Sequence, residues 1–183
     1  MLGDDLLFAS DDETEEQEQG LAAWKVLIVD DEPEIHAVTK MVLGDFEFEG
    51  RRIEFHTANS ALEARTLLEA QDNDGFAVAL VDVVMESSQA GLDLVRWIRE
   101  TLDNQVVRII LRTGQPGEAP EERVIRDYDI NDYKNKTELT ALRLKTAMYA
   151  ALRAYRDLRL IERHRLGLEK IIHATRPCKS RKQ

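Results

Sequence analysis

The 183-residue sequence contains a single cysteine, Cys178, so it has no framework of intrachain disulfides. It has no apolar run near the ~20 residues that a transmembrane helix needs, and its first residues lack the basic region of a secretory signal. Apolar residues still make up 43% of the chain, which suits a globular protein with a sizeable core. These features favour a soluble, cytoplasmic protein that has no membrane partner.

Basic residues are missing from the first 20 positions, which carry eight acids. Those acids produce most of the net charge of −10, because the remaining 27 acids and 25 bases nearly cancel. We therefore expect residues 1–23 to form an acidic, disordered tail. The opposite end, residues 176–183, is a basic tail without interleaved aromatic residues, so nucleic acid is not an expected partner.

Between these ends, segments that predict strands alternate with helical patterns. Three of them are apolar runs, WKVLIVD, FAVALVDVV and VVRIILRTG. RRIEFHTA alternates apolar Ile53 and Phe55 with polar neighbours, and INDYKNK predicts a brief fifth strand and turn. The alternation predicts an α/β fold, a doubly wound five-stranded parallel sheet whose two faces are both covered by helices. We place this domain at residues 24–150.

Four helical segments connect the predicted strands. The first begins at Pro33 and places Ile35, Val38 and Val42 on one face. The second has Asn59 or Ser60 as its cap, with Glu63 placed for a capping box. The third carries its apolar stripe on Leu92, Val95, Ile98 and Leu102, and the fourth is a short helix over PEERVIRDYD.

A much longer helix is predicted from Thr137 to about Thr175, a stretch with no proline and only one glycine, Gly167. A spacing of three and four residues links Leu144, Ala147, Ala151, Ala154, Leu158, Ile161, Arg165, Leu168 and Ile172. This heptad seam favours a coiled coil and a homodimer. The first turns would pack on the sheet, and residues 151–175 would extend beyond it. The alternative is a helix that packs on a following domain.

Polar residues follow four of the predicted strands. They are Asp30 and Asp31, Asp82, Thr113 and Lys136. In parallel sheets chemistry collects at the carboxyl ends of the strands, so we expect these side chains to converge. Two carboxylates at ~4 Å repel by about 4 kcal/mol at an effective dielectric near 20, so the cluster needs a counter-charge.

Hard oxygen ligands of this kind suit Mg²⁺ or Mn²⁺. Transfer of a phosphoryl group to an aspartate needs a nucleophilic carboxylate and groups that stabilise the phosphoryl oxygens. Asp82 could be the nucleophile, and a divalent cation, the Lys136 ammonium and the Thr113 hydroxyl could stabilise those oxygens. As a single residue, Asp30 would be read as a helix cap, and Thr113 could equally be a turn residue. Their joint placement at successive strand ends favours the functional interpretation.

The motifs VLIVDDE (26–32), ALVDVVM (79–85), IILRTG (109–114) and DYKNK (132–136) resemble the receiver domain of bacterial two-component response regulators. The resemblance implies a flavodoxin-like fold and the following roles. Asp82 would be the phosphoacceptor, Asp30 and Asp31 the acidic metal pair, the backbone carbonyl of Val84 a further metal ligand, Thr113 the switch hydroxyl, Lys136 the active-site lysine, and Tyr133 the aromatic that reports the state. The family assigns no essential role to Glu32.

The sequence departs from the family pattern at two places. Thr137 stands where receivers usually have proline, which makes Lys134 a rival to Lys136, although the spacing to Tyr133 favours Lys136. Glu86 stands where proline is common, and it could alter the lifetime of the phosphoryl group or access to it. Every essential residue is present.

The stretch RAYRDLRLIERHRLGLEKIIHAT resembles a linker of multidomain regulators, in which it often leads to a cyclic-dinucleotide phosphodiesterase output of the HD type. The leading hypothesis is therefore a receiver that accepts a phosphoryl group from a histidine kinase or phosphotransfer protein and signals through the long helix. Such a domain is not an enzyme beyond self-catalysed phosphotransfer and dephosphorylation.

Two other functions are compatible with parts of the pattern. The first is a metal-binding dimerisation module that performs no phosphotransfer. The second is a Mg²⁺-dependent phosphatase with Asp82 as nucleophile, but such enzymes commonly need a second aspartate two residues later, where this chain has Val84.

Overall fold

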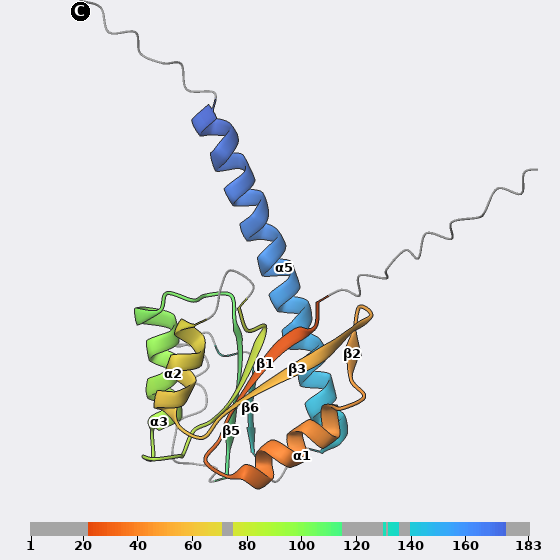
Figure 1. Cartoon of the computed structure of the whole chain (residues 1–183), viewed down its shortest axis with the longest axis vertical. Coiled ribbons are helices and arrows are strands. Elements are labelled where there is room, and N and C mark those ends of the chain that lie inside the picture. The colour runs from red at the N-terminus through yellow and green to blue at the C-terminus, as the bar shows by residue number, and fades with distance from the viewer. Residues whose placement is uncertain (1–21, 71–74, 115–129, 131, 136–139, 175–183) are drawn as a thin grey trace, which may run out of the picture.

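The computed structural model describes residues 22–70, 75–114, 130, 132–135 and 140–174. Its sheet has six strands in the order β2-β3-β1-β4-β5-β6 (Figure 1). The parallel strands are β1 (Trp24–Val29), β3 (Arg51–Ala58), β4 (Val78–Asp82), β5 (Arg108–Thr113) and β6 (Asp132–Asn135). The predicted five parallel strands are confirmed. An additional edge strand, β2 (Glu47–Phe48), pairs antiparallel with β3.

Helices cover both faces of the sheet, as a doubly wound fold requires. The helices α1 (Pro33–Leu43) and α5 (Ala141–Ala174) lie on one face, and α2 (Ala61–Glu69) and α3 (Ala90–Arg96) lie on the other (Figure 1). After α3 the chain continues through a wider π-helical turn, η1 (Trp97–Thr101). The predicted helix over residues 120–129, the basic tail and most of the acidic tail lie outside the described residues.

Alternation along the strands divides the core between the two faces. In β1, Leu27 and Val29 join the cluster under α2 and α3, while Val26 and Ile28 join the cluster under α1 and α5. All four side chains are fully buried. Because successive side chains of a strand point to opposite faces, a run of apolar residues is what a sheet covered on both sides needs.

The apolar face predicted for α1 is wrong at Val38, whereas Val42 packs partly buried against the core under α1 and α5 and Ile35 is half-buried. The helix buries His36, Thr39 and Leu43, whereas Val38 is 51% exposed. The predicted positions, among them Ile35, each lie one residue before a buried one. Two polar residues face inward because the sheet presents a buried arginine and a buried aspartate at this place, as described below.

The start of α2 matches its predicted capping box. Ser60 is the N-cap, and its side-chain oxygen accepts a hydrogen bond from the backbone N–H of Glu63 at 3.2 Å. The Glu63 carboxylate in turn accepts from the backbone N–H of Asn59 at 2.8 Å. The first bond satisfies an N–H group that the first turn of a helix leaves without a partner, and the second ties the residue before the cap to the same turn.

The long helix α5 packs on the sheet only through its first turns. Met148 and Leu152 are fully buried, and the ring of Tyr155 packs edge-on against Trp24 at a centroid distance of 6.1 Å. Further along, Ile161 and Leu168 are 64% and 61% exposed. The helix thus leaves the domain as the sequence predicts (Figure 1). None of the helices in the described part of the chain is long and apolar enough to cross a membrane.

Candidate functional site

Four carboxylates meet at the carboxyl end of the sheet. Asp30 and Asp31 follow β1, Glu32 is the N-cap of α1, and Asp82 is the last residue of β4. One oxygen from each of these residues lies within 4.8 Å of the others. The neighbouring strands β1 and β4 end together, with Val29 in register with Val81, and this pairing brings the acids side by side.

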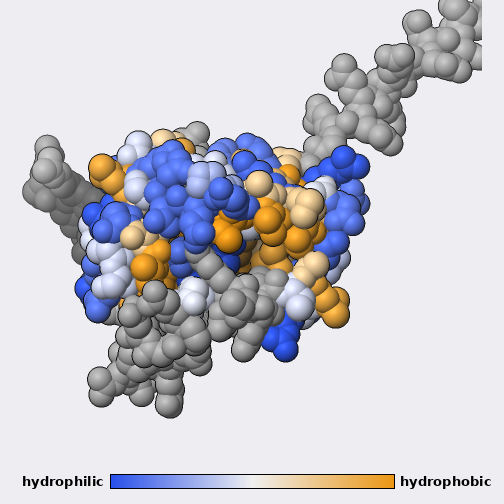
Figure 2. All heavy atoms as spheres, turned by 90° about the horizontal axis from the view of Figure 1, so that it is seen from below, coloured by the Kyte–Doolittle hydropathy of each residue, from blue (hydrophilic) through white to orange (hydrophobic). Residues whose placement is uncertain are grey.

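Burial separates these acids into two groups. Asp30 and Asp82 are 0% and 2% exposed, whereas Asp31 and Glu32 are exposed. The end of the molecule where α1 begins faces the viewer in Figure 2, and its coloured surface is mixed, with hydrophilic side chains between several groups of hydrophobic ones. The cluster therefore has an inner pair of acids and an outer pair that solvent reaches.

Both oxygens of Asp30 are held by the protein. Oδ1 accepts a hydrogen bond from the backbone N–H of Glu32 at 3.1 Å. Oδ2 lies 3.3 Å from Nη2 of Arg112, and this is a buried ion pair. The backbone N–H of Asp30 donates to the carbonyl of Ala58 at 3.1 Å, so the residue is fixed at both backbone and side chain.

Arg112 is the residue of this site that the sequence analysis missed. It is 3% exposed, lies in register with Asp82 on the neighbouring strand, and donates from Nη1 to Thr39 Oγ1 at 2.9 Å. Burial lowers the pKa of its guanidinium, and the charges of Asp30 and Asp82 oppose that effect. The available signal was a charged residue inside the apolar run RIILRT, beside a strand that ends in an acid.

His36 lies on the inner side of α1 next to this pair and is 8% exposed. Burial lowers the pKa of its imidazole, and a hydrogen bond with the backbone of Asp30 acts in the opposite direction. Together with Thr39, His36 explains why the buried face of α1 is polar near the site.

The loop after Asp82 is fixed by its backbone. The N–H of Val83 donates to the carbonyl of Arg112 at 2.9 Å, and the N–H of Gly91 donates to the carbonyl of Val83 at 3.1 Å. Gly91 lies so close to β4 that a Cβ atom there would be 1.9 Å from the carbonyl oxygen of Asp82. Val84, which follows Val83 in this loop, is half-buried, and its backbone carbonyl remains a predicted metal ligand.

Glu86 belongs to this loop, but it reaches toward α2. Its Oε1 accepts a hydrogen bond from the backbone N–H of Ala61, in the first turn of that helix, at 3.0 Å. A carboxylate is favourable at a helix N-terminus. Glu86, which replaces the proline common in the family, is thus held by the first turn of α2. Its influence on the lifetime of the phosphoryl group stays a prediction.

The remaining predicted site residues belong to β5 and β6. Thr113 ends β5 and is 1% exposed. It is in register with Asn135, the last residue of β6, and Tyr133 of that strand pairs with Leu111. Lys136 follows β6 directly and lies outside the described residues. The strand ends therefore put Thr113 beside the chain segment that leads into Lys136.

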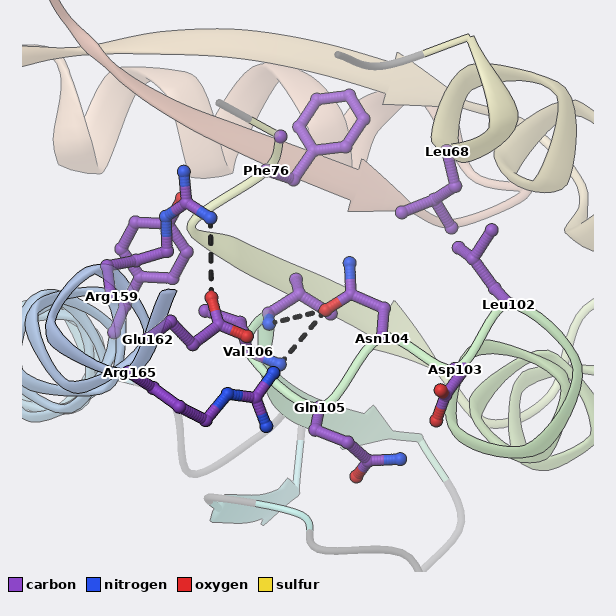
Figure 3. Close-up of a pocket in the computed structure, with 13 residues that line it drawn as sticks. Leu68, Phe76, Leu102, Asp103, Asn104, Gln105, Val106, Arg159, Glu162 and Arg165 are labelled. Carbon is purple, nitrogen blue, oxygen red and sulfur yellow. Dashed lines mark hydrogen bonds and ion pairs between the residues drawn. The ribbon is translucent and has the colours of Figure 1, made fainter. Parts of the chain in front are cut away.

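A groove of about 590 Å³ lies at the opposite end of the sheet (Figure 3). Its walls come from the loop 102–107 before β5 and from Arg159, Glu162 and Arg165 of α5. Arg159 pairs with Glu162 at 3.4 Å, and Asp103 supplies a second acid opposite the two arginines. This groove is separate from the carboxylate cluster and balanced in charge.

Comparison with known proteins connects these features to a family. The family described as the response regulator receiver domain matches residues 26–147, and a domain of unknown function (DUF3369) matches residues 148–179. The 3'3'-cGAMP-specific phosphodiesterase 2 of Vibrio cholerae is 55% identical over 152 residues. That match covers 83% of this chain but only 29% of the relative's length.

Solved structures share the fold at lower identity. An adenylate cyclase from Rhodopirellula baltica superposes with a TM-score of 0.64 at 23% identity, over 79% of this chain and 98% of the other. The receiver domain of an HD domain-containing protein from Pseudomonas fluorescens gives 0.61 at 20% identity, over 74% and 98%. These structural matches show the fold alone. The family match over residues 26–147, which spans well over half of the chain, shows that the chain belongs to the response regulator receiver domain family, the signalling domain of two-component systems.

Proposed function

We propose that Asp82 is the phosphoacceptor of this receiver and that Asp30, Asp31 and Asp82, with the carbonyl of Val84, form its metal site. The observation that carries the proposal is the convergence of four carboxylates within 4.8 Å at the ends of β1 and β4, with Asp82 buried at its base. Hard oxygen donors in this number fit Mg²⁺, and Mn²⁺ is the second candidate. When bound, the cation would neutralise charge on the phosphoryl oxygens.

In the proposed reaction, a carboxylate oxygen of Asp82 forms a bond to phosphorus. The phosphorus–nitrogen bond of a phosphohistidine on a kinase or phosphotransfer protein breaks, and its electron pair returns to the imidazole ring. Lys136 would place a positive charge beside the phosphoryl group, and Thr113 would donate its hydroxyl. The aspartyl phosphate then hydrolyses on the domain itself, so no other catalytic activity is assigned to this chain.

The proposal is tested by phosphorylating the protein with Mg²⁺ and a small phosphodonor and measuring its intact mass. One added phosphoryl group is expected on the unaltered chain and none on Asp82→Asn. Asp93→Asn is the matched control, because Asp93 is an exposed aspartate on α3 that pairs with Arg96 at 3.2 Å. Equal labelling of Asp82→Asn would contradict the assignment, and no labelling of any form would favour a module that only binds metal.

Phosphorylation is proposed to act on a two-state element that includes Thr113, Tyr133 and α5. The docked part of α5 touches β4 and β5, which carry the site, and Lys145 pairs with Asp45 at 2.8 Å. The helix is continuous from Ala141 to Ala174, across the boundary between the two family matches at residues 147 and 148. We assign residues 24–150 to the receiver and residues 151–175 to an extended helix that transmits its state.

The output that this helix controls is proposed to be a cyclic-dinucleotide phosphodiesterase, the class named for the Vibrio cholerae relative. Support comes from the identity of 55%, which extends over residues of both matched families. The test is to assay cyclic-dinucleotide hydrolysis by the full reading frame with and without phosphodonor, in the unaltered and Asp82→Asn forms. A hydrolysis rate that is the same with and without phosphodonor in both forms would contradict regulation of the output by phosphorylation. A cytoplasmic location is part of the same proposal.

The exposed seam of α5 is proposed to pair with a second copy of the chain. The seam positions are buried at Leu144 and Ala151, half-buried at Leu158, and exposed at Ile161 and Leu168. A stripe that packs on the sheet therefore continues beyond it, where Ile161 and Leu168 are exposed in the described part of the chain, and its heptad spacing suits an identical helix.

Light scattering is expected to show a dimer that becomes a monomer when Ile161 and Leu168 are both changed to glutamate. Leu160→Glu is the control, because Leu160 is 53% exposed but lies off the seam. A monomeric unaltered protein, or a monomer produced by the control, would contradict pairing through the seam.

A further inference from the structure

Buried arginines occur at both ends of β5, and they have different partners. At the amino end, Arg108 is 4% exposed and donates from Nε to the backbone carbonyl of Val106 at 2.8 Å. At the carboxyl end, Arg112 is 3% exposed and donates to two side chains, Thr39 at 2.9 Å and Asp30 at 3.3 Å. The second arginine is therefore aimed at the carboxylate cluster.

The surroundings of Asp30 show what this cation does. A fully buried carboxylate is costly unless it is paired and hydrogen-bonded. Asp30 is 0% exposed, with one oxygen on the N–H of Glu32 and the other on Arg112. Asp82 lies in register with Arg112 on the neighbouring strand and is 2% exposed. The negative charge of Asp82 therefore also acts on this guanidinium. Thr39 anchors the guanidinium to α1.

We propose that Arg112 is the internal counter-cation of this site and the positioning residue of Asp30. It pairs with Asp30 and offsets part of the charge of the two inner carboxylates when no divalent cation is bound, so the site stays folded without metal. Its positive charge also opposes the binding of a divalent cation at the neighbouring Asp31 and Asp82, which moderates the affinity for Mg²⁺. The inference rests on the proposed metal site for its second part, whereas its first part concerns the metal-free protein alone.

The experiment compares thermal unfolding of Arg112→Met and Arg108→Met, with and without Mg²⁺. Without metal, Arg112→Met removes the guanidinium that pairs with the buried Asp30. The Tm of this variant is expected to be lower than that of the unaltered protein by roughly 10 °C. Mg²⁺ should recover part of this loss, so the Mg²⁺-induced rise in Tm is expected to be larger than in the unaltered protein. The Mg²⁺ Kd, measured by titration, should fall several-fold.

Arg108→Met is the matched control, because it removes a buried guanidinium from the same strand at the end far from the carboxylates. Its Tm should fall by the same amount with and without Mg²⁺, and its Mg²⁺ Kd should not change. If Arg112→Met behaves in this same way, Arg112 only fills space and the proposal is overturned.

The double variant Asp30→Asn/Arg112→Met tests the pairing without any metal. It removes both charges, so it is expected to unfold at a higher temperature than Arg112→Met alone. A double variant no more stable than the single one would overturn the counter-cation role, even where Arg112→Met fails to fold. Absence of any Mg²⁺ effect on the unaltered protein would instead count against the proposed metal site and leave this comparison of charges intact.

Discussion

Replacing Gly91 by alanine tests how closely α3 approaches the strand that carries Asp82. The new Cβ atom would lie 1.9 Å from the carbonyl oxygen of Asp82, 2.8 Å from its carbonyl carbon and 2.9 Å from Cα of Val83. Ordinary contacts between such atoms begin near ~3.5 Å. All three obstacles are backbone atoms, so no side chain can rotate away, and α3 and β4 must separate by more than about 1 Å.

The cost can be worked out from these contacts. Overpacking a buried site costs about 1–3 kcal/mol and occasionally more. The separation also lengthens the 3.1 Å hydrogen bond from Gly91 to the carbonyl of Val83, which contributes about 1 kcal/mol. We therefore expect Gly91→Ala to lower the free energy of unfolding by about 4 kcal/mol, a large part of the 5–15 kcal/mol of an average domain.

Urea unfolding followed by circular dichroism measures this loss directly. Gly167→Ala is the matched control, because the added methyl group in the exposed part of α5 meets nothing within 4 Å apart from the adjacent residues and backbone of its own helix. That change should leave unfolding of the domain unaltered and raise helix content slightly, since alanine favours a helix over glycine by about 1 kcal/mol. A Gly91→Ala protein with unaltered stability and normal phosphorylation at Asp82 would refute the reasoning.

Further predictions concern the cap of α2, the docking of α5 and one surface ion pair. Ser60→Ala removes the oxygen that accepts the N–H of Glu63 and should destabilise the domain by about 1 kcal/mol in urea unfolding. Leu152→Ala, at a fully buried position of α5, should cost about 2–5 kcal/mol, whereas the exposed Leu160→Ala should change little. Lys145 lowers the pKa of Asp45 by hydrogen bonding and by its charge, so Asp45→Asn should be slightly less stable than the unaltered protein at neutral pH. That difference should shrink as the pH falls below the ordinary pKa of an aspartate and vanish only below the lowered pKa of Asp45 in the folded protein, because protonated Asp45 no longer attracts Lys145. A difference that persists at still lower pH would contradict the pairing.

The strands β1, β4 and β5 could be predicted closely because each is a short apolar run with a polar end, and β3 could be predicted from the alternation of apolar and polar residues. The strand over Arg51–Ala58 coincides with its predicted range. It runs parallel to β1, and the last residues of the two strands, Ala58 and Val29, are in register. The edge strand β2 could not be predicted, because two residues carry no detectable alternation. Its position depends on the turn after Phe48, where Glu49 and Gly50 both adopt positive φ.

The buried face of α1 and the role of Arg112 were missed for one common reason. Periodicity identifies a buried face by its apolar residues, so it selects Val38 over Thr39. The structure selects Thr39, because a buried guanidinium on β5 needs an oxygen acceptor. Thr39 and Arg112 are 73 positions apart in the chain, and only the fold brings them together. Buried polar pairs of this kind stay invisible to a reading of local patterns.

The continuous helix α5 also has a mechanical consequence. Its docked part ends near Tyr155, and Ala174 is its last residue, so about 28 Å of helix extends beyond the domain at 1.5 Å per residue. A rigid rod of that length acts as a lever. A tilt of about 5° at its base would move its far end by about 2.5 Å, close to half a helical turn. Small repacking around Tyr155 is thereby converted into a displacement large enough to realign a partner helix.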